Sequence, residues 1–336
     1  MFFALTEDQQ EFDAAVRSYL AGRFDLEAVR RVVEDPASDG NPAALWKAAG
    51  EQGWLAVTVP EEHDGLGLGL IEAQVIARAL GAGVAPGPWR GTVLAAEAIR
   101  LAGSDEQRSQ WLPKLAGGEA VGAVTLRGTA GGALPAVEYG AVADVVVAPS
   151  GDGLALVTGA TATARASYDG TTRLADLDGG TAEELPGAGA VEQITARGAV
   201  LVAADLVGIA REALTRTVAY DRDRQQFGVP VGSFQAIKHA LADLHVNVTM
   251  AEHAALYAAH AVDAGLDGAP LAVAVAKAKA SDTALAATAA MIQYHGGIGY
   301  TWEHEAHFFY KRAKRLAAQF GDADAHRERI AALTLG

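Results

Sequence analysis

The chain has 336 residues, half of them hydrophobic, and 41 acidic against 27 basic side chains give it a formal net charge of −14. A chain of this length and composition is globular and forms two or three packed units rather than one core. No concentrated basic face is visible, which argues against a nucleic-acid partner, and the absence of cysteine excludes disulfides, thiolate metal sites and a cysteine nucleophile.

The first residues and the apolar runs indicate the expected cellular location of the chain. Residues 1–8 contain no basic n-region and no long apolar stretch, so we expect no signal peptide. The apolar run 269–276 is short and is soon followed by Lys277 and Lys279, so we expect no membrane span. The lack of cysteine fits a reducing compartment, and a cytoplasmic location is the expectation.

Residues 1 to about 118 show the pattern of helices joined by short loops. Thr6 and Gln9 form an N-terminal capping signal, and residues 45–46 belong to a further helix. Segment 53–67 contains too many Gly and Pro residues for regular structure, so we expect a shaped turn there.

The rest of this region predicts three more helices. Two are expected over 71–80 and 94–101. A third is capped by Ser104 and Gln107 and is expected to end near Pro113.

From about 119 to 190 the periodicity changes. Short apolar runs at 121–126, 144–148 and 154–158 are bounded by Gly, Pro and Asp, which is typical of strands. Their close spacing indicates a small barrel or sandwich.

From about 191 onward the helical period returns. Long helices are predicted over 199–223, 233–263, 270–295 and 303–318, the second with Ser233 as N-cap. Such short connections favour an up-down bundle. The basic side chains Lys277, Lys279, Lys311, Arg312, Lys314 and Arg315 are predicted to lie on solvated faces.

A tight corner joins the first two of these helices. Gly228 and Pro230 break the helical pattern, and the corner carries the guanidinium of Arg224 and the ring of Phe227. A planar cation suits bidentate contact with a pyrophosphate. The alternative is a basic residue near a helix C-terminus beside a core phenylalanine.

Two sequence signatures decide between these interpretations. The first is Arg-x-Gln-Phe-Gly-x-Pro at 224–230 followed by Phe-Gln-x-x-Lys at 234–238, and the second is Gln-Tyr-His-Gly-Gly-Ile-Gly-Tyr at 293–300. Together they resemble the C-terminal signatures of the acyl-CoA dehydrogenases, flavoenzymes that desaturate an acyl thioester between Cα and Cβ. The resemblance spans most of the chain and weakens only in the middle.

The resemblance implies a fold, a cofactor and a set of binding residues. The fold would be α+β, mostly α, with an N-terminal helical domain at 1–118, a shortened middle β-barrel-like domain at 119–190 and a C-terminal four-helix bundle at 191–336. The family's bundle binds the adenine and pyrophosphate end of FAD that belongs to a neighbouring subunit. The positions that match this pattern are Arg224, Gln226, Phe227, Gln235, Gln293, Gly296 and Gly297.

The family's means of holding the flavin ring is missing. Where the family has Thr-Glu-Pro and then Gly-Ser, this chain has a Gly- and Ala-rich stretch at 125–132, and no Trp-x-Thr element lies between 134 and 143. A Thr hydroxyl and a Trp face are what hydrogen-bond and stack on an isoalloxazine, so this half of the site is predicted to be eroded.

The family's catalytic glutamate has no counterpart either. Ungapped counting places Phe320 at the usual position and Gly198 at the alternative one, and neither can accept a proton. The possible substitutes are Asp322, Glu303, Glu305 and His304. Each has a simpler explanation as a helix-end or loop residue, so no catalytic residue is assigned. His295 and His307 are predicted to be structural, and no metal site is predicted.

Three hypotheses follow from this pattern. The first is a subunit of a heteromeric acyl-CoA dehydrogenase, of α2β2 type, in which a homologous chain supplies the flavin-ring pocket and the base; some such enzymes act on bulky sterol-derived thioesters. The second is a self-sufficient homo-oligomeric acyl-CoA dehydrogenase with a displaced base. The third is a non-enzymatic scaffold that keeps the fold.

Overall fold

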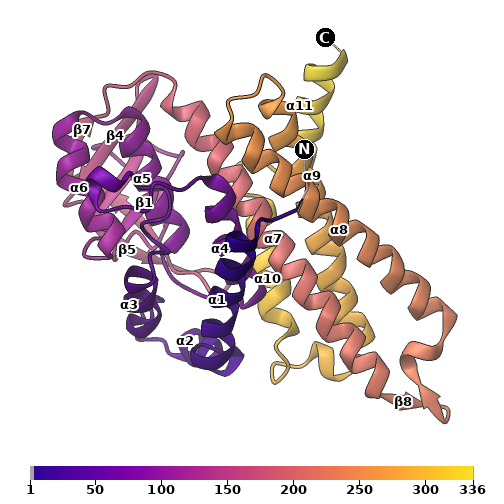
Figure 1. Cartoon of the computed structure of the whole chain (residues 1–336). Helices are drawn as coiled ribbons and strands as arrows, with labels where there is room; N and C mark the ends of the chain where they lie inside the picture. Colours follow the sequence, from indigo (N-terminus) through magenta and orange to yellow (C-terminus); the bar gives the residue numbers. More distant parts are fainter. Residues whose placement is uncertain (1–3, 336) are drawn as a thin grey trace. The chain divides into compact units, whose positions relative to one another are not determined.

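We analysed a computed structural model of the chain, which describes residues 4–335. Its residues form two compact units (Figure 1). One unit contains the residues up to Leu26, the segment Gln74–Ala85 and the residues from Ala199 on, and the other contains Glu27–Ala73 and Pro86–Gly198. The domain boundaries expected near 118 and 190 stay predictions.

The second unit combines short helices with two small sheets. Its helices are α2 (Leu26–Glu34), α3 (Ala43–Glu51), η1 (Glu61–His63), the first turn of α4 (Leu70–Ala82), α5 (Trp89–Ala102), α6 (Asp105–Gly117) and the first residues of α7 (Ala190–Asp223). Its strands are β1 (Gly122–Val124), β2 (Leu134–Glu138), β3 (Val145–Ser150), β4 (Gly153–Thr158), β5 (Thr161–Arg165), β6 (Leu174–Asp178) and β7 (Thr181–Glu184).

The strands pair in two separate orders. One sheet has the order β1-β3-β4-β7, with β1 parallel to β3, and the other has the order β2-β6-β5. Apolar residues of β3 and β4 face opposite ways into two buried clusters, one shared with α5 and α6 and one shared with β2 and β6. This strand-rich region matches the small barrel or sandwich that the apolar runs indicate.

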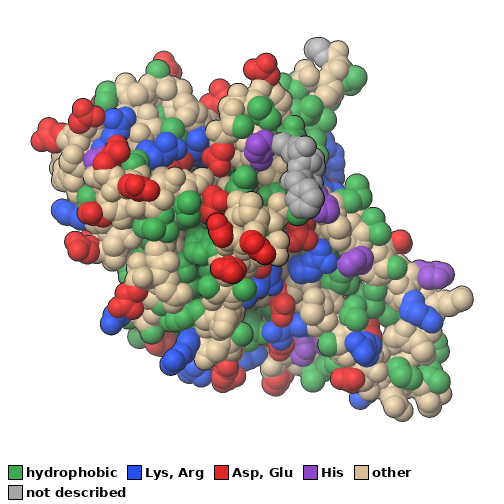
Figure 2. All heavy atoms as spheres, in the orientation of Figure 1, with side chains coloured by type: hydrophobic (Ala, Val, Ile, Leu, Met, Phe, Trp, Pro, Cys, Tyr) green, Lys and Arg blue, Asp and Glu red, His purple; other side chains and the backbone are tan. Residues whose placement is uncertain are grey.

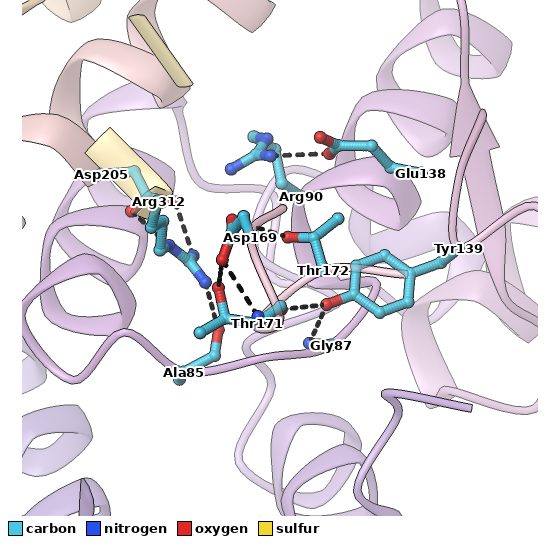
Figure 3. Close-up of polar contacts among 10 residues, drawn as sticks. All are labelled: Ala85, Gly87, Arg90, Glu138, Tyr139, Asp169, Thr171, Thr172, Asp205 and Arg312. Atoms are coloured by element: carbon cyan, nitrogen blue, oxygen red, sulfur yellow. Dashed lines mark hydrogen bonds and ion pairs between the residues drawn. The ribbon is translucent and has the colours of Figure 1, made fainter. Parts of the chain in front are cut away.

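A buried tyrosine fixes one corner of this unit. The Tyr139 hydroxyl accepts a hydrogen bond from Gly87 N at 2.7 Å and donates one to Thr171 O at 2.9 Å (Figure 3). Next to it, Asp169 is fully buried and accepts from the backbone and the hydroxyl of Thr171. These contacts satisfy loop groups that would otherwise be buried without partners.

The first unit is helical. It contains α1 (Glu7–Arg23), most of α4, the main part of α7, α8 (Gln235–Asp263), α9 (Ala269–Tyr294), α10 (Ala306–Ala317) and α11 (Ala323–Leu335). Short elements connect them: the hairpin β8 (Gln225–Gln226) and β9 (Val229–Pro230), η2 (Val231–Ser233) and η3 (Ile298–Tyr300). Helix α9 packs against α8, α10 and α11, and β8 lies at the tip where α7 meets α8 (Figure 1).

Two glycines let α4 and α7 touch backbone to backbone. A Cβ atom at Gly208 would lie 2.0 Å from Arg78 O, and one at Gly81 would lie 2.2 Å from Asp205 O. A side chain at either position would force the helices apart. The same contact is closed by a buried ion pair, in which Arg312 of α10 donates to both carboxylate oxygens of Asp205 and, through Nη1, to Ala85 O at 2.9 Å (Figure 3).

The capping predictions are confirmed. Thr6 with Gln9 and Ser104 with Gln107 both form complete capping boxes, at the starts of α1 and α6. The predicted end of the latter helix is wrong, because α6 continues through Pro113 to Gly117. Buried Leu112, Leu115 and Ala116 hold this last turn, and they offset the one hydrogen bond that a proline removes.

The prediction of solvated basic faces is wrong for three residues. Lys277 is fully buried, and Arg312 and Arg315 are less than a tenth exposed. The long helix α7 is long and apolar enough to cross a membrane, since an 18-residue window within it has a mean hydropathy of 1.4. However, 83% of this window is buried inside the protein. It is therefore a core helix.

Candidate functional site

The corner after α7 is a two-residue β-hairpin. Gln226 pairs with Val229, and the loop residues Phe227 and Gly228 both have positive φ, at 53° and 79°. Two positive φ angles match the hairpin turn whose twist fits the flanking strands. Phenylalanine is costly in this region, which is a strain typical of functional sites.

Phe227 does not belong to the core. Its side chain is 93% exposed and meets the ring of Phe234 edge to face, with centroids 6.3 Å apart. The alternative of a core phenylalanine is therefore wrong. The hairpin holds an aromatic face out to solvent beside Arg224, Gln226 and Gln235, which are all exposed.

The start of α8 lies directly beside the hairpin. Ser233 is not its N-cap, because η2 carries the chain one residue further and Phe234 takes the N-cap position with no side-chain hydrogen bond. The N-terminus of a long helix carries partial positive charge and backbone N–H groups that favour an anion. Val231 N bonds to Arg224 O at 2.7 Å and so ties Arg224 to this helix start.

The second signature ends α9. Gly296 has φ 64° directly after the helix, and Gly297 opens η3, so the predicted left-handed turn is confirmed at Gly296. A Cβ added at either glycine would meet nothing within 4 Å. Gln293 is exposed on the last turn of α9. This backbone is therefore open to close approach by a ligand.

A ring stack joins the two signatures. Tyr220, in the last turn of α7, stacks on His295 with centroids 4.4 Å apart, and His295 lies 4.5 Å from His304. Burial, followed by the nearby cations, lowers the pKa of His295. The stack holds the end of α7 against the end of α9, next to the predicted binding residues that follow α7, begin α8 and end α9. We call this region the bundle end.

A buried aspartate near the bundle end, Asp221, was not among the predicted site residues. Asp221 is buried at the end of α7, and neither of its carboxylate oxygens has a hydrogen-bond partner among the described residues. Burial raises its pKa to about 6. Its place in the sequence, just before exposed Arg222, gives no hint of this, because the burial comes from the return of the chain at Gly232.

The other unit contains no platform for a flavin ring in the predicted region. The Thr125 hydroxyl is used in a local turn, where it accepts from Arg127 N at 3.1 Å. Residues 122–138, which include this loop, contain no aromatic side chain. The structure therefore offers backbone and small side chains where stacking would be needed.

The position that matches the family's base is a strained turn. Phe320 has φ 52° and Gly321 has φ 95°, between α10 and α11. His326 Nε2 donates to Phe320 O at 2.9 Å, and Lys277 Nζ donates to Ala317 O at 3.0 Å and Gly321 O at 2.8 Å. Sequence reasoning missed Lys277, since two of its three acceptors lie 40 or more residues away.

The possible substitutes for the base have other roles. Asp322 is exposed and accepts from Ala325 N at 2.9 Å as a cap of α11. Glu305 bonds to Arg216 at 2.9 Å. Burial would raise the pKa of Glu305, but hydrogen bonds and the charges of His304 and Arg216 lower it. A general base needs the opposite tuning.

The remaining candidates are tied to the chain nearby. Glu303 is exposed, and His304 Nδ1 accepts from Ala306 N at 3.1 Å. His295 and His307 bond to carbonyl oxygens of residues four and five positions away. No group of three or more potential metal ligands occurs within residues 4–335.

Two family models and several known proteins match this chain. The acyl-CoA dehydrogenase C-terminal domain matches residues 186–335, and the N-terminal domain matches residues 6–119. Acyl-CoA dehydrogenase IpdE2 of Mycobacterium tuberculosis is 38% identical over 310 residues, which cover 91% of each chain. The chain belongs to the acyl-CoA dehydrogenase family.

Solved structures of the family confirm the predicted fold. A variant of the Tcur3481–Tcur3483 steroid ACAD matches with a TM-score of 0.90 at 27% identity and covers 98% of both chains. The ChsE4–ChsE5 complex from Mycobacterium tuberculosis matches with a TM-score of 0.91 at 25% identity, over 99% of this chain and 98% of the other. The resemblance inferred from the two signatures is thus correct.

Proposed function

We propose that this acyl-CoA dehydrogenase family member works as one subunit of a heteromeric, FAD-dependent enzyme that desaturates an acyl-CoA thioester. Its bundle end would bind the adenine and pyrophosphate half of FAD. A homologous partner chain would supply the flavin-ring pocket and the catalytic base. The single observation that carries this proposal is that the predicted dinucleotide residues meet at one end of the bundle, while the matching ring platform and base are absent from residues 4–335.

The bundle end fits a pyrophosphate. Arg224 offers a planar fork of donors, and the N-terminus of α8 beside it has no side-chain cap. Gly296 and Gly297 leave room for backbone contact, and the exposed ring of Phe227 offers a stacking face for adenine. Gln226, Gln235 and Gln293 add amide donors and acceptors.

The chemistry would be divided between the two chains. The flavin, when bound, accepts a hydride from the substrate Cβ. This chain's residues would hold the dinucleotide in register and would themselves move no proton, since Phe320 stands where the family has its glutamate. Lys277 and His326 donate hydrogen bonds to backbone carbonyls of the adjacent turn, so these side chains would fix its conformation rather than supply a catalytic base.

Similar proteins support the partner and the substrate class. Two of the matched structures are named as pairs of chains, and one of them is named a steroid ACAD. We therefore propose an α2β2-type assembly with a bulky, sterol-derived acyl-CoA thioester as the substrate class. Nothing in the acidic composition favours nucleic acid.

The test is flavin absorbance. The purified chain, alone and mixed with a longer homologous dehydrogenase chain, is dialysed against FAD, and the oxidised flavin band is measured after gel filtration. We expect a bound flavin only in the mixture. Full flavin occupancy and turnover by this chain alone would contradict the heteromer and favour a homo-oligomeric enzyme.

Variants locate the half-site. Arg224→Ala should weaken FAD binding by the mixture at least tenfold, because a charge-assisted contact is worth about 1.5–3 kcal/mol. The matched control is Arg222→Ala, which removes another exposed arginine from the end of α7. Equal effects of the two changes, or no nucleotide affinity in any mixture, would favour a scaffold role.

A further inference from the structure

A buried carboxyl group lies at the start of the corner that carries the proposed nucleotide residues. Asp221 is 1% exposed, whereas the residues after it, from Arg222 to Pro230, are all exposed. Neither of its carboxylate oxygens has a hydrogen-bond partner within residues 4–335. A buried polar group without a partner is uncommon in a folded protein and calls for an explanation, of which a functional role is one.

The chain itself encloses this carboxyl group. After the hairpin, η2 returns to the end of α7, where a Cβ atom at Gly232 would lie 3.0 Å from Asp221 O and 3.4 Å from Asp221 Cβ. The hydrogen bond from Val231 N to Arg224 O, at 2.7 Å, closes the loop between them. Asp221 is therefore buried by the same corner that presents Arg224 to solvent.

No charged side chain offsets this burial. Burial alone raises the pKa of Asp221 to about 6, and no ion pair or charged neighbour contributes to the change. The protonation of Asp221 is therefore free to respond to a charge that binds at the corner. The titratable and charged groups on the elements around this corner include Arg216, Tyr220, Arg222, Asp223, Arg224, Lys238, His239, His295, His304 and Glu305.

The corner as a whole attracts an anion. Arg224 is exposed, and the N-terminus of α8 beside it has no side-chain cap and adds partial positive charge. Figure 2 shows hydrophobic and basic side chains on the surface of this tip, which Figure 1 labels β8. An ionised Asp221 opposes this attraction, because a buried charge without a counter-ion is poorly screened by salt.

We propose that Asp221 couples nucleotide binding at the bundle end to the uptake of a proton. The carboxyl group is ionised in the empty site at neutral pH and protonated when the pyrophosphate of a dinucleotide is bound. The proton comes from the solvent and returns to it on release. Asp221 touches neither the substrate nor the reacting atoms, so its role is regulatory. This proposal rests on the proposed function, since its ligand is the anionic half of FAD.

The coupling makes FAD affinity depend on pH in one direction. Binding requires protonation of Asp221, so affinity should fall as the pH rises. In equilibrium dialysis, the mixed subunits should bind FAD about fivefold more weakly at pH 8 than at pH 5.5. Asp221→Asn is uncharged and of similar shape, so it should keep the higher affinity at both pH values. The matched control Asp223→Asn removes an exposed acid and should keep the pH dependence of the wild type.

Calorimetry measures the proton directly. FAD is titrated into the mixed wild-type subunits at pH 6.5, in two buffers that differ in their enthalpy of ionisation. The difference between the two heats should correspond to an uptake of about half a proton per FAD. The mixture that contains Asp221→Asn should lack this uptake, and the one that contains Asp223→Asn should show it.

The chain without FAD gives an independent readout. The pKa of Asp221 is near 3.8 in the unfolded chain and higher in the folded chain, so its ionisation destabilises the fold as the pH rises from 4 to 7. In urea unfolding, the wild type should therefore lose stability relative to Asp221→Asn over this range. Circular dichroism confirms that each variant is folded.

The outcomes separate this proposal from the proposed function. An unchanged pH dependence of FAD affinity in Asp221→Asn, or no proton uptake by the wild type, would overturn the coupling and leave the half-site intact. Equal pH dependence of stability in the wild type and Asp221→Asn would also overturn it, because the acid would not be buried in solution. If no mixture binds FAD at any pH, the half-site is wrong and the coupling falls with it.

Discussion

Lys277 in α9 donates a hydrogen bond to the carbonyl oxygen of Gly321, at 2.8 Å, in the turn between α10 and α11. The same ammonium bonds to Ala317 O and to the Ser281 hydroxyl, and all three acceptors are uncharged. Burial lowers the pKa of Lys277 to about 8, although the charge of Asp322 works in the other direction. A buried cation therefore holds the turn that occupies the place of the family's base.

Lys277→Met tests this arrangement through pH. In the unfolded chain the lysine pKa is near 10.5, so between pH 8 and 10.5 the unfolded state binds more protons and the free energy of unfolding rises with pH. From pH 7.5 to 9.5 the wild type should gain about 2 kcal/mol relative to the variant. Urea unfolding at the two pH values measures this difference, and a relative gain by the variant would contradict it.

The Tyr220–His295 stack gives a second pH prediction, with the same sign but in a lower pH range. Burial lowers the pKa of His295, so the unfolded chain binds more protons as the pH falls below 6.5. His295→Phe keeps the ring and removes the titration. The wild type should therefore lose stability relative to this variant between pH 7.5 and pH 5, as measured by thermal unfolding.

The same position tests the geometry of the bundle end. His295→Ala removes the stack that joins α7 to the Gly296–Gly297 turn, and it should weaken FAD binding by the mixed subunits. His295→Phe should restore that binding. If alanine and phenylalanine bind FAD equally well, the stack has no positioning role.

Two glycine substitutions should have opposite effects on stability, because Gly208 lies in the contact between α4 and α7 and Gly22 lies in open space. Gly208→Ala places a Cβ 2.0 Å from Arg78 O, so the backbone must move and stability should fall by more than about 2 kcal/mol. Gly22→Ala, in α1, meets nothing within 4 Å and should stabilise by up to about 1 kcal/mol. Chemical denaturation of both variants measures the difference, and effects of the same sign would contradict the packing.

The Arg312–Asp205 pair predicts a large loss on removal of one partner. Arg312→Met removes the guanidinium from its ion pair with the buried carboxylate of Asp205 and should cost about 3–5 kcal/mol. Arg165→Met breaks the exposed pair with Asp176 and should cost less than about 1 kcal/mol. The double variant Arg312→Met/Asp205→Leu should recover part of the loss in a denaturation series.

The features that the sequence predicted correctly are set by nearby residues. The capping boxes at Thr6 and Ser104 need only the residue three positions on, and the turn at Gly296 follows from a glycine after a long helix. Strands β5 and β7 were not predicted, because every residue in them is exposed and neither contains a large apolar side chain. Their register is set by pairing with β6 and β4.

The errors at the candidate site come from contacts far along the chain. The burial of Lys277 is created by the α10–α11 turn, and that of Arg312 by Asp205 and Ala85. The exposure of Phe227 depends on a hairpin with two positive φ angles, which propensity disfavours for phenylalanine. The grouping of the two signatures required the fold, although the family resemblance had anticipated it.

The segment 74–85 bears on how the chain can be divided. It lies within the N-terminal family match, yet its backbone meets α7 at Gly81 and Gly208, and its last carbonyl accepts from Arg312. A fragment cut to the C-terminal match alone would expose Gly208 of α7 and would remove the Ala85 carbonyl from the Arg312 guanidinium. Protease nicking between the two matched regions should therefore leave both pieces associated until denaturant is added.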